Sequence, residues 1–254
     1  PQNVANCVWA CAKLGTQSPN LFRLLETKAD WLFSNGKTQE ISSCVWSCAR
    51  LGIQSPNLFQ LLDSKSDWLF ESKNPQNVSN CVWACATLGI QAPNLFRFLD
   101  KKTDWLFHNG KTQEISNCVW ACAKLGIQSP NLYQLLDTKA DWIFESGNPQ
   151  NVANCVWACA KLGIESPNLF RLLDTKIDWV FEYGNTQDVS NCIWAISENG
   201  PLPQKVIDLI DQQSEWLLSQ DDFHAVAMVA LSLAKDNVKS STFIALLKEK
   251  VTKA

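Results

Sequence analysis

The sequence predicts an all-α fold, specifically an α-solenoid made of 37-residue helical hairpins. Three observations lead to this prediction. Cysteine and tryptophan recur with one fixed period, apolar residues inside each period follow helical spacing, and proline and glycine fall at the edges of the expected helices. No segment has the sustained alternation of a β-strand. We expect the hairpins to stack into a right-handed superhelix.

The period explains an unusual composition of 12 Trp and 11 Cys beside 2 Tyr and 1 Met in 254 residues. One cysteine series and two tryptophan series advance in equal steps: Cys7, Cys44, Cys81, Cys118, Cys155, Cys192; Trp9, Trp46, Trp83, Trp120, Trp157, Trp194; and Trp31, Trp68, Trp105, Trp142, Trp179, Trp216. The predicted units cover residues 1–37, 38–74, 75–111, 112–148, 149–185 and 186–222. Residues 223–254 diverge from the pattern and are expected to form a C-terminal capping repeat. The chain starts inside a repeat and without Met, so we expect a piece of a longer array.

The first helix of the first unit is predicted to run from Gln2 to Leu14, with Gly15 as a left-handed stop. Val4, Cys7, Val8, Cys11 and Leu14 share one apolar arc, which we expect to pack on the second helix. Odd units open with Pro-Gln-Asn and even units with Thr-Gln-Glu or Thr-Gln-Asp, an alternation that suggests growth by duplication of pairs of units.

The second helix is predicted from Pro19 to about Phe33, with Ser18 as its N-cap. This helix is apolar on nearly three sides and can pack on both neighbouring units. Its outward positions include Glu26 and Asp30, and acidic residues recur at the equivalent positions: Asp63, Asp100, Asp137 and Asp174, and Asp67, Asp104, Asp141 and Asp178. We expect this row of charge to be a solvated outer face.

The first helices are then expected to line the inner, concave side with four rows of side chains. The amide row is Gln2, Gln39, Gln76, Gln113, Gln150 and Gln187; the second row is Asn6, Ser43, Asn80, Asn117, Asn154 and Asn191; the third is Trp9, Trp46, Trp83, Trp120, Trp157 and Trp194; the fourth is Lys13, Arg50, Thr87, Lys124, Lys161, Glu198 and Lys235. Aromatic rings stack on bases, amides read base edges and cations meet phosphates. These rows are therefore candidates for binding single-stranded RNA.

Each row also has a structural interpretation. An indole can lie over Ala5 and Ala12 as packing between units, and Gln2 or Asn6 can cap a helix or form amide ladders. Lys13 and its equivalents can simply favour the helix C-terminus through the helix dipole.

The cysteines predict neither disulfides nor a metal site. Cys7 and Cys11 lie on one helical turn, where disulfide geometry is poor, and zinc ligands usually flank a loop and include histidine. Only His108 and His224 are present, outside the repeated positions. We interpret the cysteines as small buried hydrophobes in a reducing compartment. No Gly-rich phosphate loop or catalytic cluster is apparent, so we expect no enzyme, no cofactor, no metal and no small-molecule substrate.

The segment Asn154-Cys155-Val156-Trp157-Ala158-Cys159-Ala160-Lys161-Leu162-Gly163, preceded by Pro149-Gln150-Asn151-Val152, resembles the signature of octotricopeptide and heptatricopeptide repeats. The resemblance covers units one to five well, unit six in part and residues 223–254 only in outline. It implies an RNA-binding α-solenoid of chloroplasts or mitochondria that acts in transcript stability, processing or translation. It places Asn6, Trp9 and Lys13 and their equivalents on the signature helix.

The leading hypothesis from the sequence is a non-enzymatic protein that holds single-stranded RNA along its first helices. The competing hypothesis is a protein-binding scaffold or a structural subunit of a larger organellar complex, which the formal net charge of −3 favours. No apolar run reaches the roughly 18 residues of a membrane span, so no span is expected.

Overall fold

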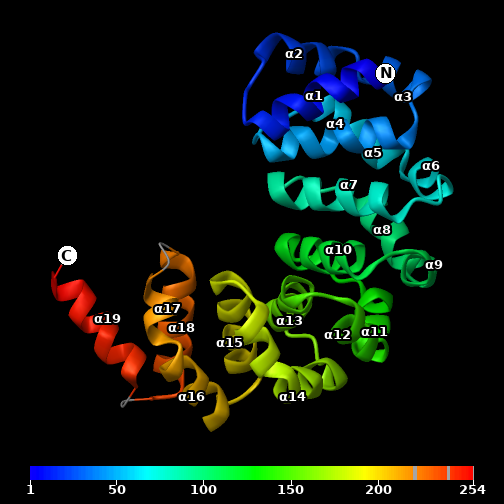
Figure 1. Cartoon of the computed structure of the whole chain (residues 1–254). Helices are drawn as coiled ribbons and strands as arrows, with labels where there is room; N and C mark the ends of the chain where they lie inside the picture. The colour runs from blue at the N-terminus through cyan, green and yellow to red at the C-terminus, as the bar shows by residue number, and fades with distance from the viewer. Residues whose placement is uncertain (220–221, 239–240, 254) are drawn as a thin grey trace. The chain divides into compact units, whose positions relative to one another are not determined.

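The computed structural model describes residues 1–219, 222–238 and 241–253. Every regular element within these residues is an α-helix, and helices adjacent in the chain pack on one another (Figure 1). The predicted all-α solenoid class is therefore confirmed. The chain forms two compact units, residues 1–135 and residues 136–254, which are described separately.

The predicted first helices form the inner layer of each unit. In the first unit α4 packs between α1 and α7, and α7 packs on α10, as Figure 1 shows; in the second unit α15 packs between α13 and α18. Their bounds are α1 Gln2–Leu14, α4 Thr38–Arg50, α7 Pro75–Leu88, α10 Thr112–Leu125, α13 Pro149–Leu162, α15 Thr186–Asn199 and α18 Phe223–Lys235. The boundaries of the 37-residue units themselves stay a prediction.

These helices begin and end with capping residues that the sequence supplies locally. The Asn74 side chain accepts the N–H groups of Gln76 and Asn77, and the Glu40 carboxylate accepts the Lys37 N–H at 2.8 Å. At the other end Gly89 has φ +70°, a left-handed conformation that L-residues rarely adopt. The next N–H, of Ile90, then reaches the Cys85 carbonyl at 2.8 Å.

The predicted second helix is broken in the structure. The segment from Pro19 forms α2 and then α3, and Lys28 between them has φ −112° and ψ 19°, outside the helical region. Pairs formed in this way are α2 Pro19–Thr27 with α3 Ala29–Asn35, α5 Pro56–Ser64 with α6 Ser66–Glu71, α8 Pro93–Lys101 with α9 Thr103–Asn109, α11 Pro130–Thr138 with α12 Ala140–Ser146, and α16 Gln204–Gln212 with α17 Ser214–Ser219. The prediction of one straight second helix was wrong.

The same break occurs inside α14 Pro167–Tyr183, where Lys176 has φ −109°, and α19 Thr242–Lys253 closes the second unit. Near several breaks a hydroxyl bonds a preceding carbonyl, as Thr103 does to Leu99 at 3.1 Å, and such bonds bend helices. Ala29 and Ile177 stand at the corresponding position without a hydroxyl, so the hydroxyl is not required for the break.

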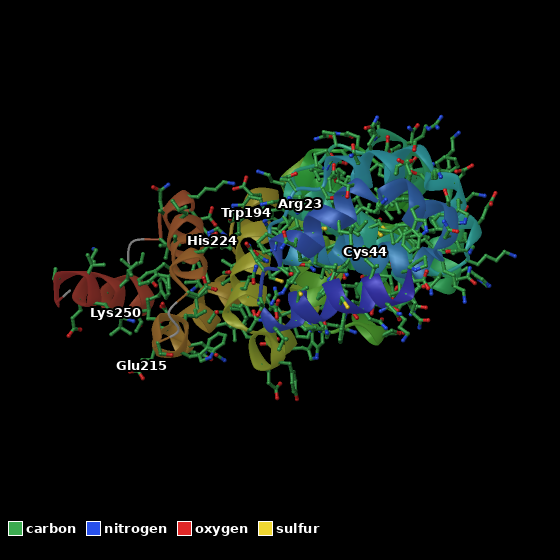
Figure 2. All side chains as sticks on the ribbon, turned by 90° about the horizontal axis from the view of Figure 1, so that it is seen from above. Arg23, Cys44, Trp194, Glu215, His224 and Lys250 are labelled. Atoms are coloured by element: carbon green, nitrogen blue, oxygen red, sulfur yellow. The ribbon has the colours of Figure 1, made fainter. Side chains whose placement is uncertain are left out.

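Valine and cysteine of the first helices and leucine of the second helices are the most regularly buried side chains of the core. Val45, Cys48 and Cys81 are fully buried, and Figure 2 shows Cys44 among the side chains inside the first unit. The cysteines are free thiols. The predicted apolar arc of α1 is only partly buried: Cys7 and Leu14 are exposed and Cys11 is half-buried, because α1 has a neighbouring first helix on one side only.

Most of one predicted acidic row, that of Glu26 and its equivalents, is not a solvated face. Four carboxylates in this register reach the start of the following hairpin and accept a serine hydroxyl there, in the pairs Glu26 with Ser55, Asp100 with Ser129, Asp137 with Ser166 and Asp211 with Ser241. Asp174 of the same row is exposed, as predicted. Ala92 replaces serine in one hairpin, and Asp63 there accepts the Asn94 side chain and the Leu95 N–H instead. The other row, Asp30 and its equivalents, is exposed as predicted.

Candidate nucleic-acid interface

A groove of about 430 Å³ lies along the inner helices of the first unit. Eight of the predicted site residues line it: Trp9, Lys13, Gln39, Ser43, Trp46, Gln76, Asn80 and Gln113. The structure thus brings together side chains from α1, α4, α7 and α10 that are up to 104 positions apart in the chain. Among the described lining residues there is no carboxylate, although the chain as a whole is acidic.

The amide row is available to a ligand. Gln39, Gln76 and Gln113 each occupy the first turn of their helix, and all three side chains are exposed. Asn80 lies one turn further on and is half-buried. A side-chain amide has both donor and acceptor atoms, which is the chemistry that reads base edges.

The indole row is packed more closely than a row of free stacking platforms. The Trp46 and Trp83 ring centroids are 6.4 Å apart with 29° between the planes, and both side chains are half-buried. Aromatic pairs with centroids about 4.5–7 Å apart interact favourably with each other. The two indoles therefore already serve as stacking partners for each other between neighbouring units. Packing between units, the structural interpretation of this row, is what the geometry favours for Trp46 and Trp83.

Lys13 lies beside the first two tryptophans of this row. Its ammonium lies 5.4 Å from the Trp9 ring centroid and 5.5 Å from the Trp46 centroid. Cation–π contacts of this kind keep a charge at the groove surface. Lys13 is exposed, so the same ammonium is open to a phosphate.

The cationic row differs between the two units. In the first unit Lys13, Arg50 and Lys124 lie exposed in the last turns of their helices. In the second unit Lys235 forms an ion pair with Glu198 at 2.9 Å. The pair neutralises one cation there, which leaves the first unit as the more cationic of the two along this row.

The remaining predicted site residues lie outside the groove. In the first unit they are Gln2, Asn6, Arg50, Trp83, Thr87, Asn117, Trp120 and Lys124; in the second unit they are Gln150, Asn154, Trp157, Lys161, Gln187, Asn191 and Trp194. Trp157 and Trp194 repeat the close packing, with centroids 6.4 Å apart. The rows thus continue in both units, and the first unit has the described groove.

Three groove residues were missed by the sequence analysis: Ser42, Asn74 and Asn77. Asn77 is buried and joins two helices, since its amide donates to Thr38 at 3.1 Å and its carbonyl oxygen accepts from Ser42 at 3.1 Å. Thr38 belongs to a Thr-Gln-Glu opening and Asn77 to a Pro-Gln-Asn opening. The alternation of the two unit openings could have indicated this bond, because one opening supplies Thr38 and the next supplies Asn77.

Two further findings concern other kinds of site. Among the described residues, no three His, Cys, Asp or Glu side chains are grouped so that they could hold a metal ion. None of the helices that the structure describes has both the length and the apolar character needed to cross a membrane.

Comparison with known families shows to which family the chain belongs. A family model described as RNA-editing substrate-binding complex 6 protein matches residues 1–200 and, in a second match, residues 69–253. The chain belongs to this family. The two matches overlap, as is typical of a repetitive sequence that a repetitive model fits in more than one register. No curated protein matches the chain in sequence.

The description of this family names an RNA-editing substrate-binding complex. In this chain the inner helices of the first unit offer a polar groove beside exposed cations, and its described lining residues include no carboxylate.

Proposed function

We propose that this chain is a non-enzymatic RNA-binding subunit that holds single-stranded RNA along the inner helices of its first unit. The observation that carries the proposal is the groove itself. Its lining combines Gln39, Gln76 and Gln113 with Lys13, and no carboxylate is among the described lining residues. A chain with a net charge of −3 that keeps acids out of one groove has a surface suited to a polyanion.

The proposed contacts differ from intercalation between indoles. The exposed glutamines and Asn80 bind base edges, while Lys13, Arg50 and Lys124 bind phosphates. Trp9, whose side chain is 46% exposed, offers a face for stacking, whereas Trp46 and Trp83 stay packed on each other. Trp9 and Trp46, the two indoles that line the groove, then form part of its wall.

Family membership and the repeat signature both support an RNA-related role. The family description names an RNA-editing substrate-binding complex, and we propose that this chain contributes to substrate RNA binding in such a complex. The resemblance to octotricopeptide repeats favours a chloroplast or mitochondrial protein acting on transcripts after their synthesis. Location in an organelle and the lack of enzymatic activity are parts of this proposal.

A protein scaffold is the second candidate, and a specific observation favours it. The stacked, half-buried Trp46 and Trp83 act within the fold, which removes part of the proposed RNA surface. In that case the groove holds an extended peptide, whose backbone the same amides can bind.

Fluorescence anisotropy with short labelled RNAs tests the proposal. We expect saturable binding of single-stranded RNA and much weaker binding of duplex RNA. The double substitution Gln39→Ala and Gln76→Ala should weaken binding about tenfold or more, because each lost base contact is worth about 1 kcal/mol. The matched control, Gln54→Ala with Gln60→Ala, removes exposed glutamines away from the groove and should change nothing. Equal binding by both double variants, or no binding of any RNA, would favour the scaffold.

A further inference from the structure

A second recess of the first unit lies among the outer helices α6, α8 and α9, away from the groove. It has a volume of about 300 Å³, and we call it the Phe98 pocket. Its rings are Phe70, Phe98 and Trp105, and its charged residues are Asp67, Glu71, Lys73 and Lys102. Phe70 stacks on Phe98 at a centroid distance of 6.0 Å, and Trp105 meets Phe70 edge-on, also at 6.0 Å.

The corresponding place at two other hairpin junctions is occupied by a lysine of the chain itself. Lys65 has its ammonium 5.6 Å from the Phe33 ring centroid, and Lys176 has its ammonium 5.8 Å from the Phe144 centroid. Both lysines are half-buried. These junctions show that the phenylalanine at this position accepts a cation.

The Phe98 pocket departs from that pattern, and one residue difference distinguishes it from those two junctions. Phe98 stands where Leu61 and Leu172 stand at the other two junctions. Its ring stacks on Phe70, and Lys102, the equivalent of Lys65, is exposed rather than half-buried. Lys102 still lines the pocket but is exposed, and Phe98 adds a third ring beside Phe70 and Trp105.

We propose that the Phe98 pocket binds a lysine or arginine side chain of a partner protein. Three ring systems offer their π-electrons to a cation, the basis of aromatic cages. Asp67 and Glu71, one helical turn apart on α6, supply carboxylates at the rim. Lys73 and Lys102 also line the pocket, and all four charged residues are exposed, so the preference for a cation rests on the three rings, with the two carboxylates as rim partners.

Arg97 gives an additional indication of the ligand chemistry. Its guanidinium lies 5.5 Å from the Phe98 ring centroid, so this ring already accepts a planar cation from the same helix. Lys73 at the rim has φ +55°, a conformation uncommon for lysine, and such backbone outliers gather at binding sites. The proposal does not depend on RNA binding in the groove, which uses other helices.

The test is a titration of the full chain, labelled with ¹⁵N at tryptophan, with acetylated and amidated Gly-X-Gly peptides. The indole resonance of Trp105 is assigned with the Trp105→Phe variant. We expect peptides with lysine or arginine at X to shift this resonance, with affinity about threefold to thirtyfold above that of the glutamine peptide. The Phe98→Leu variant should lose the shift, because it removes the ring that stacks on Phe70 and lines the pocket.

Phe98→Leu is expected to fold, since leucine occupies this position at other junctions, and circular dichroism checks this. The double variant Asp67→Asn and Glu71→Gln removes the two exposed carboxylates at the pocket rim. It should weaken binding of the lysine peptide. The proposal is overturned if the glutamine peptide binds as well as the lysine peptide, or if both variants bind the lysine peptide like the original chain. A shift of Trp105 by single-stranded RNA in place of the cationic peptides would also overturn it.

Discussion

Asp137 caps the first turn of the hairpin segment that follows it, since its carboxylate accepts the Ser166 hydroxyl at 2.8 Å and the Asn168 N–H at 2.9 Å. Ser166 holds the N-cap position of α14 but does not cap that helix with its own side chain. The capping group therefore comes from the preceding hairpin. A carboxylate at a helix N-terminus is favoured by the helix dipole, so each such contact stabilises the junction between successive hairpins.

Replacing this carboxylate should destabilise the second unit. We expect Asp137→Ala to lower the free energy of unfolding by about 1.5–3 kcal/mol, the range for hydrogen bonds to a charged group. Urea denaturation followed by circular dichroism measures the effect. Asp141→Ala is the matched control, because Asp141 is exposed in the first turn of α12 and should contribute only about 0.3–1 kcal/mol through the helix dipole. Similar losses for the two variants would contradict the capping role.

The opposite experiment adds a serine at the hairpin that lacks one. Ala92 is buried at the N-cap of α8, beside the Asp63 carboxylate. Ala92→Ser should add the missing hydroxyl bond and raise stability by about 0.5–1.5 kcal/mol. The gain should disappear when Ala92→Ser is combined with Asp63→Ala. An unchanged midpoint of thermal unfolding for the single variant would show that the serine contributes nothing to the junction.

The salt dependence of RNA affinity tests the cationic row. Replacement of Lys13, Arg50 and Lys124 by alanine should reduce the slope of log affinity against log salt by about 2, because each phosphate contact of a single strand contributes about 0.7. Lys235→Ala should leave the slope unchanged, since Lys235 is paired with Glu198. If the triple variant keeps the slope of the original chain, the three cations do not contact phosphate.

Alkaline pH should weaken the fold through the buried thiols. Burial raises the pKa of the Cys44, Cys48 and Cys85 thiols from 9.0 to about 12. Above pH 9 the unfolded chain loses these protons while the folded chain keeps them, so stability is full below pH 9 and falls as pH rises toward 12. Each thiol should cost about 1 kcal/mol by pH 10.

Urea unfolding between pH 7 and pH 10.5 in the presence of a reductant measures this loss. The Cys85→Ala variant should show a shallower decline than the original chain, because it lacks one of the shifted thiols. A decline of equal steepness would exclude Cys85 as a contributor. Thiol labelling at neutral pH should modify exposed Cys7 well before the buried cysteines, which remain protonated.

The bounds of the inner helices could be predicted because their signals are local. The spacing of Val8 and Cys11 and the glycine after Leu14 predict a helix from Gln2 to Leu14, and α1 has these bounds. The break at Lys28 could not be predicted, since Lys28 carries no local signal such as proline. The acidic row was misread for a related reason: Glu26 faces away from its own hairpin, and its partner Ser55 belongs to the next one.

The candidate site was predicted as four rows, and the structure divides them by environment. The spacing of Gln39, Gln76 and Gln113 was enough to place these amides along one surface, where they now line a single groove. The packing of Trp46 on Trp83 and the position of Lys13 over two indoles depend on the distance between neighbouring helices. The spacing of residues along one helix does not determine the distance between two helices.

The sequence by itself determined the all-α class, the 37-residue period and which helix faces are apolar, because burial of an amphipathic helix is decided by residues three and four positions apart. The tertiary structure alone decided which charges cap a neighbouring hairpin, where the second helices break and which junction leaves a pocket. Phe98 illustrates the difference: one ring in place of leucine is a minor change in the sequence. Stacked on Phe70, the same ring lines a pocket, and this effect depends on a residue of the preceding hairpin.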